Sequence, residues 1–121
     1  MKQIQKTLKT EKKKPYYTYI IKCKNNSLYT GITTDIDRRF SEHKGKKLGA
    51  KYTRAFGVKK VMALWKTKNT ENAKSKSMKL ESRIKKLSRA KKLVLISDKK
   101  QFKNIFSDFI EKNEFARVEV F

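Results

Sequence analysis

Two short segments rich in aromatic and β-branched residues, separated by a pair of asparagines, constrain the fold of this chain more than any other feature. Residues 17–23 (YTYIIKC) and 28–32 (LYTGI) both have the composition of β-strands. Asn25 and Asn26 lie between them, and asparagine accepts the positive φ angles of a tight turn. The sequence therefore predicts a β-hairpin near the start of the chain.

A helix is expected directly after this hairpin. Thr34 is a suitable N-cap, with Asp37 three residues later, and the helix would run through Lys44. Ile36 and Phe40 share one face of it, four residues apart, and can pack against the hairpin. The first helix would thus be tied to the sheet.

The same hairpin and helix define a candidate site. Tyr19 and Tyr29 lie on the two predicted strands, while Arg39 and His43 share a second face of the helix because they are four residues apart. Two phenols would thereby lie beside a guanidinium and an imidazole. Aromatic residues in a hairpin are usually packing groups, so the packing and catalytic interpretations both stand at this point.

The rest of the chain supplies one more strand and further helices. Residues 58–66 (VKKVMALWK) predict a third strand, apolar enough to lie centrally. An amphipathic helix follows, with apolar or small residues at helical spacing: Ala73, Ser77, Leu80, Ile84 and Leu87. Ser88 can cap another helix that contains residues 93–96. Finally, a C-terminal amphipathic helix is expected from the spacing of Phe102, Phe106 and Phe109.

The charge is large and unevenly distributed. Lysine and arginine total 33 against 11 acids, a net charge of +22 over 121 residues. Residues 98–121 contain five acids and five bases, so the whole excess lies before them. We therefore expect a basic and flexible arm over residues 1–15, one domain over 16–97 and a neutral, Phe-rich helical extension over 98–121. A polyanion is the expected partner, nucleic acid first and an anionic membrane surface second, although a solubilising lysine-rich surface would look similar.

The apolar composition argues for a cytoplasmic protein. The single cysteine, Cys23, excludes an internal disulfide and cannot form a structural zinc site alone, so it is expected in the core. The longest apolar runs, residues 61–65 and 93–96, are too short to span a bilayer. The N-terminus also lacks the apolar segment of a secretory signal.

Residues 45–57 predict a loop with cations around an aromatic ring. Lys51, Tyr52, Thr53 and Arg54 suit contacts with a sugar-phosphate backbone or stacking on an exposed base. A solvated loop whose tyrosine packs into the core is the equal alternative.

Glu81 is exceptional because it is the only acid between residues 72 and 97, among nine cations. It lies at the border of the apolar helix face rather than opposite it. An ion pair with Lys85, four residues on, would explain it and would contribute only about 0.2–0.5 kcal/mol. The alternative is a metal ligand, because Mg²⁺ is commonly bound by one or two carboxylates together with substrate phosphates.

Taken together, these residues resemble the GIY-YIG nuclease superfamily, most closely its small single-domain bacterial subgroup. The resemblance covers about residues 16–96 and rests on six segments in register: TYIIKC, SLYTGITTD, RRFSEH, GAKYTR, LESRIK and LSRAKK. The chain departs from the name-giving motifs, with Tyr17-Thr18 in place of Gly-Ile and Thr30 in place of isoleucine. Residues 55–57 are also less basic than expected. The resemblance implies an α/β protein of the α+β type: a three-stranded antiparallel sheet flanked by helices, in the order β-β-α-β-α-α.

The resemblance also implies site residues and a cofactor. It places Tyr19, Tyr29, Arg39 and His43 in the catalytic site, with Arg38 as a one-residue ambiguity for the arginine. Glu81 takes the position of the ligand for Mg²⁺ or Mn²⁺. A metal-dependent endonuclease follows as the expected function, with structured or damaged DNA among its candidate substrates.

Further contacts with nucleic acid are expected at the surface, from Arg38, Lys51, Tyr52, Arg54 and Lys85. The alternative is a protein of the same fold that binds DNA or structured RNA without turnover, which the net charge supports equally. Association of the basic arm with an anionic membrane is a third possibility. The C-terminal tail is a possible attachment point for a protein partner.

Overall fold

The computed structural model describes residues 14–45 and 57–120, with only the backbone of residues 43–45. The predicted basic arm, except for its last residues, and the loop with Lys51, Tyr52 and Arg54 lie outside the described residues. The first half of the fold contains β1 (Tyr17–Cys23), β2 (Leu28–Thr33), α2 (Ile36–Gly45) and β3 (Val58–Thr67). The second half contains α4 (Ala73–Lys85), α5 (Arg89–Ser97), α6 (Gln101–Ile105), the 3-10 helix η1 (Ile110–Glu114) and β4 (Phe115–Arg117).

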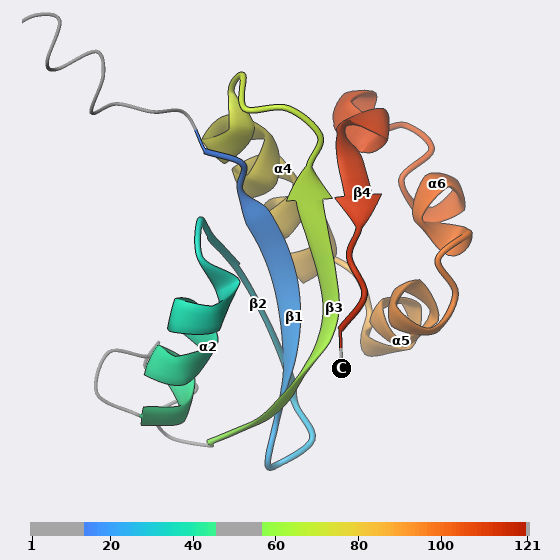
Figure 1. Ribbon diagram of the computed structural model, residues 1–121. Coiled ribbons are helices and arrows are strands. Elements are labelled where there is room, and N and C mark those ends of the chain that lie inside the picture. Colours follow the sequence, from blue (N-terminus) through green and yellow to red (C-terminus); the bar gives the residue numbers. More distant parts are fainter. Residues whose placement is uncertain (1–13, 46–56, 121) are drawn as a thin grey trace, which may run out of the picture.

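The strands form one antiparallel sheet in the order β2-β1-β3-β4, which Figure 1 shows with α2 on one face and α4 behind the other. The expected α+β class, with its hairpin, first helix and third strand, is confirmed. The sheet has four strands rather than three, because the end of the chain adds β4 beside β3. β3, which was predicted to lie centrally, therefore has a neighbouring strand on each side.

The hairpin closes as its asparagines predict. Asn26 has a φ of 69°, and its N–H donates to the carbonyl of Cys23 at 2.8 Å. The N–H of Cys23 donates to the carbonyl of Ser27 at 2.9 Å. This turn sets the register in which Tyr19 lies opposite Gly31 and Ile21 opposite Tyr29.

The start of α2 differs by one residue from the expectation. Asp35, not Thr34, caps the helix, because its carboxylate accepts the Arg38 N–H at 3.1 Å. The Thr33 hydroxyl in turn accepts the N–H of Asp35 at 3.1 Å, which delays the first helical turn. Ser88 caps α5 as expected, accepting the Lys91 N–H at 3.2 Å.

Alternation along the strands divides the core between the two faces of the sheet. One cluster, formed by Tyr19, Ile21, Val58 and Leu64, packs against Ile36 and Phe40 of α2. The other, larger cluster lies beneath the remaining helices, and its members are Ile20, Ala63, Trp65, Leu80, Ile84, Leu95, Phe102, Phe106, Phe109 and Phe115. The predicted apolar face of α4 and the burial of Cys23 are confirmed.

The C-terminal tail is more irregular than the single amphipathic helix that its phenylalanines predict. α6 ends at Ile105, η1 follows, and Phe115–Arg117 forms a strand. The three predicted phenylalanines are buried, but they are distributed over a helix and the turns that follow it. The chain straightens at residue 115 because β3 offers an open edge, where Thr67 pairs with Phe115 and Trp65 with Arg117. In the described part of the chain, no helix is long and apolar enough to cross a membrane.

Candidate functional site

Tyr19 lies directly over the glycine of the neighbouring strand. Its side chain is almost fully buried, and Gly31 is its register partner across the β1–β2 pair. A Cβ atom at Gly31 would lie 2.6 Å from Cζ of the tyrosine and closer still to its hydroxyl oxygen. Only glycine therefore leaves room for this phenol.

Tyr29 lies next to Tyr19 on the same face of the sheet. The two ring centroids are 6.5 Å apart, with the planes inclined by 41°. Tyr29 is half-buried and packs at the margin of the Tyr19 cluster. The pair of tyrosines predicted from the sequence is thus brought together, through one turn of the hairpin.

Arg39 is the arginine that reaches the tyrosines. Its guanidinium donates a hydrogen bond to the Tyr19 hydroxyl, and its Nη1 donates to Oε1 of Glu42 at 3.0 Å. Its side chain is 26% exposed, whereas that of Arg38 is 62% exposed and approaches Glu42 only to 3.9 Å. The helix therefore presents Arg39 to Tyr19 and Arg38 to solvent.

Glu42 is a residue of this site that the sequence analysis overlooked. Its carboxylate forms ion pairs with Arg39, three residues before it, and with Arg38, four residues before it. By bonding Nη1, it restricts the guanidinium to the orientation that meets Tyr19. The spacing R-R-x-x-E was visible in the sequence and is the signal that could have identified it.

The pKa of Tyr19 is raised above that of an ordinary tyrosine. Burial is the largest cause, and the negative charge of Glu81 acts in the same direction; the hydrogen bond and positive charge of Arg39 oppose both. A nearby cation lowers the pKa of a phenol, but here desolvation outweighs the effect of Arg39. In the protein without metal, Tyr19 is therefore a protonated hydroxyl at neutral pH.

Glu81 lies on α4, with its side chain 23% exposed, and it forms the expected ion pair with Lys85 at 3.4 Å. The negative charge of Glu81 has the smallest of the effects on the pKa of Tyr19, so the carboxylate acts on that phenol only weakly and at a distance. Among the described residues, no group of three or more His, Cys, Asp or Glu side chains could hold a metal ion. A hard divalent cation would fit here only with Glu81 as one oxygen ligand and with water and substrate oxygens as the others.

The remaining predicted site residues are peripheral or outside the description. Arg38 and Lys85 are exposed, on α2 and α4 respectively. The side chain of His43 and the loop residues Lys51, Tyr52 and Arg54 lie outside the described residues. The structure thus gathers Tyr19, Tyr29 and Arg39, with Glu81 acting weakly on the first from a distance.

Comparisons with known proteins identify the family of this chain. Residues 15–94 match the family model of the GIY-YIG catalytic domain. The UPF0213 protein BH0048 of Halalkalibacterium halodurans is 46% identical over 82 residues, which are 68% of this chain and 82% of that protein. A UPF0213 protein of Vibrio cholerae is 42% identical over 83 residues, covering 69% of this chain and 78% of the relative.

A solved structure is also similar in sequence. The solution NMR structure of BH0048 from Bacillus halodurans is 44% identical, covers 69% of this chain and 83% of that one, and has a TM-score of 0.42. A GIY-YIG domain implies nuclease-type activity and binding of nucleic acid. The chain therefore belongs to the GIY-YIG family and to its small single-domain subgroup with the UPF0213 proteins.

Proposed function

We propose that this protein is a metal-dependent endonuclease that hydrolyses phosphodiester bonds in DNA. The observation that carries the proposal is the position of the Tyr19 hydroxyl. It is buried over Gly31, hydrogen-bonded by Arg39 and weakly influenced by the charge of Glu81. An ordinary core tyrosine needs no guanidinium partner.

Each side chain has a role that its chemistry supports. Arg39 offers a planar set of donors to the non-bridging phosphate oxygens and neutralises the charge that develops on them. Tyr29, which is only half-buried, would orient the attacking water, whereas the almost fully buried Tyr19 would position Arg39 through the hydrogen bond to its hydroxyl. Mg²⁺ or Mn²⁺ bound through Glu81 would polarise the scissile phosphate and stabilise the leaving oxygen. We propose that His43 assists at the same site, because it follows Arg39 by four residues in the sequence.

A comparison of two neighbouring substitutions on α4 tests the proposal. Glu81→Gln removes the proposed ligand while keeping its shape, and we expect cleavage of plasmid and branched DNA to fall about a hundredfold or more. Affinity for DNA, measured by fluorescence anisotropy, should not fall. Lys85→Gln is the matched control for the ion pair, because it breaks the same pair and leaves the carboxylate in place. Since Lys85 is expected to contact nucleic acid, its loss should lower affinity and not the cleavage rate at saturating DNA. Equal cleavage by the wild type and Glu81→Gln would refute the assignment.

The second candidate is a binding protein of the same fold without turnover, and one observation favours it. Among the described residues, no group of three or more His, Cys, Asp or Glu side chains could hold a metal ion, while the net charge of +22 favours binding of any polyanion. Such a protein would bind DNA or RNA in a salt-dependent manner and yield no product with Mg²⁺ or Mn²⁺. A panel of duplex, flap, branched and abasic DNA, with structured RNA, separates the two candidates.

A further inference from the structure

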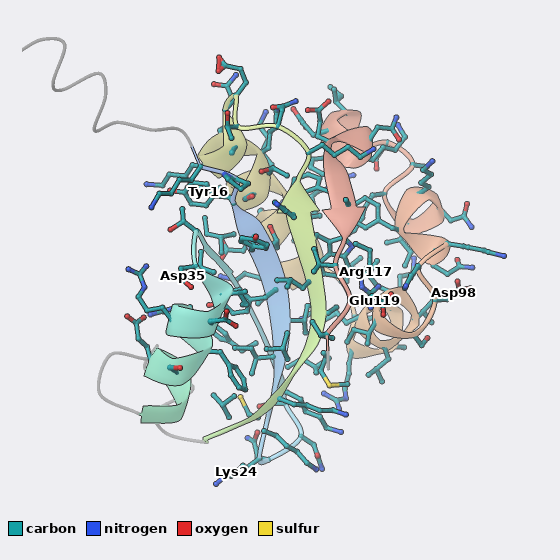
Figure 2. The ribbon with its side chains drawn as sticks, in the orientation of Figure 1. Tyr16, Lys24, Asp35, Asp98, Arg117 and Glu119 are labelled. Carbon is teal, nitrogen blue, oxygen red and sulfur yellow. The ribbon has the colours of Figure 1, made fainter. Side chains whose placement is uncertain are left out.

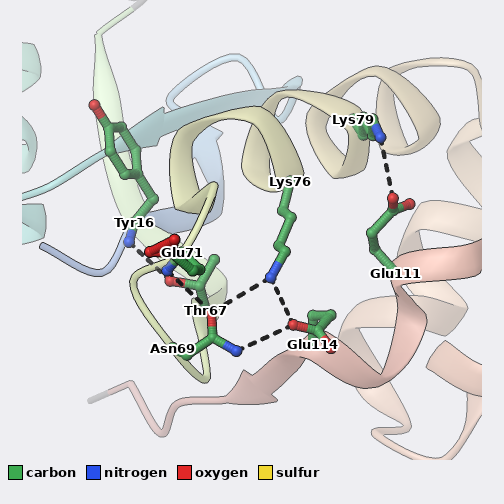
Figure 3. Close-up of polar contacts among 8 residues, drawn as sticks. All are labelled: Tyr16, Thr67, Asn69, Glu71, Lys76, Lys79, Glu111 and Glu114. Carbon is green, nitrogen blue, oxygen red and sulfur yellow. Dashed lines mark hydrogen bonds and ion pairs between the residues drawn. The ribbon is translucent and has the colours of Figure 1, made fainter. Parts of the chain in front are cut away.

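The C-terminal tail, residues 98–121, has no net charge, but many of its acidic and basic side chains lie in different places. Three of its acids pair with three cations of α4, in the combinations Lys76–Glu114, Lys79–Glu111 and Arg83–Asp108. The first two pairs measure 2.7 and 3.0 Å, and Figure 3 shows them along one side of α4. These three ion pairs attach the tail to α4.

The bases of the tail collect elsewhere, around a pocket of about 330 Å³. All five bases of residues 98–121 line it, together with one lysine that follows β3, and no acidic side chain does. We call this the cationic pocket, and its charged members are Lys68, Lys99, Lys100, Lys103, Lys112 and Arg117.

The charges of the pocket are only partly compensated within the protein. Among the described residues, Lys99 is the one member of the pocket with an ion pair, to Glu119. The Glu119 carboxylate also attracts Arg117, and that of Glu114 attracts Lys68. Arg117 instead donates to the backbone carbonyls of Leu95 and Ile96, at 3.3 and 2.8 Å. Six cations around a small concavity repel one another, and a ligand with several negative charges would relieve that repulsion.

The floor of the pocket restricts what kind of anion it can bind. It is formed by the aromatic rings of Trp65, Phe102 and Phe115, which are all buried. The guanidinium of Arg117 already covers the Trp65 ring, 5.2 Å from its centroid. No ring face is therefore free for stacking on a base, so the pocket suits phosphate groups rather than nucleobases.

The pocket lies far from the candidate active site. Tyr19 and Gly31 belong to β1 and β2, whereas the pocket borders β4 at the other edge of the sheet. Two neighbouring strands are about 4.8 Å apart, so the two edges are separated by roughly 14 Å. Figure 2 shows Arg117 and Glu119 on the tail side of the sheet and Asp35 on the α2 side. The residues that line the pocket also lie largely beyond residue 94, where the family match ends.

We propose that the cationic pocket is an auxiliary site that binds the phosphodiester backbone of a nucleic-acid strand, independently of its sequence. It would hold a part of the nucleic acid that the active site does not touch. The proposal rests on nucleic acid being the ligand of this protein, as in the proposed function, but it does not require hydrolysis.

A triple substitution tests the pocket directly. Lys68, Lys100 and Lys103 are exposed, so changing all three to glutamine removes charge with little effect on packing. The matched control changes Lys24, Lys59 and Lys91 to glutamine, which are equally exposed but line neither the pocket nor the candidate site. Binding of single-stranded DNA is measured by anisotropy over a range of salt concentrations, with chelator present so that no cleavage occurs.

We expect the salt dependence to identify the contacts. Each lost phosphate contact lowers the slope of log K against log salt by about 0.7 for a single strand, so the pocket variant should lose about 2. Its affinity at low salt should fall about tenfold or more, regardless of base sequence. The control should keep most of its slope.

Two outcomes would overturn the proposal. One is an equal loss of slope in the pocket and control variants, which would mean that total charge alone matters. The other is inorganic tripolyphosphate binding to the wild type but not to the pocket variant, while both bind DNA equally; the pocket would then serve free oligophosphate. Because cleavage is measured separately with Glu81→Gln, failure of one proposal does not imply failure of the other.

Discussion

The two edges of the sheet present two different kinds of surface. At the β2 edge, a nearly buried phenol, a glycine without space for a methyl group and a hydrogen-bonded guanidinium meet within a few ångströms. At the β4 edge, exposed lysines surround buried aromatic rings. To attract a polyanion, these lysines need only to be numerous and close together. Hydrolysis of a phosphodiester requires catalytic side chains in fixed orientations, and paired strands can provide these. Attraction of a polyanion depends mainly on the number of positive charges and tolerates flexible side chains.

The largest expected effect concerns the β4 edge. Phe102→Ala removes a ring that contacts Trp65, Phe106 and Phe115, at centroid distances of 5.8, 5.1 and 6.4 Å. The free energy of unfolding in urea should fall by about 3–5 kcal/mol, as for other buried phenylalanines. Ile110→Ala, also in the tail but 88% exposed, is the control and should change it by less than about 0.5 kcal/mol. Similar losses in both variants would contradict the packing of the tail on the core.

The next effect concerns the β2 edge. Gly31→Ala places a methyl group against the Tyr19 phenol, which should cost about 1–3 kcal/mol of stability and displace the hydroxyl. We expect cleavage to fall together with stability, measured by plasmid nicking and urea unfolding. Tyr19→Leu removes both the hydroxyl and the ring carbon that crowd this methyl, so Gly31→Ala should cost less stability in that background. Strict additivity of the two changes would argue against the close approach.

A smaller effect, on the pKa of Tyr19, is expected when Arg39 is replaced. Because its charge and hydrogen bond lower the pKa of Tyr19 against the effect of burial, Arg39→Gln should raise that pKa further. The measurement is a spectrophotometric titration of the phenolate, compared with Tyr19→Phe to assign the signal. Arg38→Gln is the control on the same helix and should leave the Tyr19 titration unchanged. A shift of equal size in both variants would show that Arg39 has no special place at the site.

The smallest effect concerns the attachment of the tail to α4. Lys76 lowers the pKa of Glu114 below its ordinary value of 4.5. A carboxyl whose pKa is lower in the folded state stabilises the fold above pH 4.5, and this contribution disappears as the pH falls through the folded pKa. Glu114→Gln should therefore be less stable at pH 7 and show a shallower loss of stability between pH 5 and 3. Unfolding curves at several pH values would check this, and an unchanged pH profile would contradict it.

Much of the fold was predictable because it depends on local signals. The hairpin follows from strand composition on either side of an asparagine turn, and α4 follows from apolar residues at helical spacing. The candidate site was predictable to the same extent, since Tyr19, Tyr29 and Arg39 lie on those elements. The cap of α2 was misplaced by one residue because Thr33, Thr34 and Asp35 are all good capping groups, and the hydroxyl of Thr33 decides between them.

The end of the chain shows where local signals fail. Phe102, Phe106 and Phe109 have the spacing of one helix, yet the segment becomes α6, η1 and β4. A strand of three residues is stabilised by the edge that it joins, so its formation depended on β3 rather than on its own sequence.

The amino-acid sequence by itself determined the first three strands, the long helix and the family, because spacing and composition act between near neighbours. The resemblance favoured Arg39 for the site and left Arg38 as an ambiguity; tertiary structure shows that Arg39 meets Tyr19, since one residue on a helix changes the direction of a side chain by about 100°. It also decided that a tail of net charge zero turns three of its five acids toward α4 and places its bases around a pocket. The composition gives only the number of charged residues of each sign, whereas the folded structure determines where each charged side chain lies.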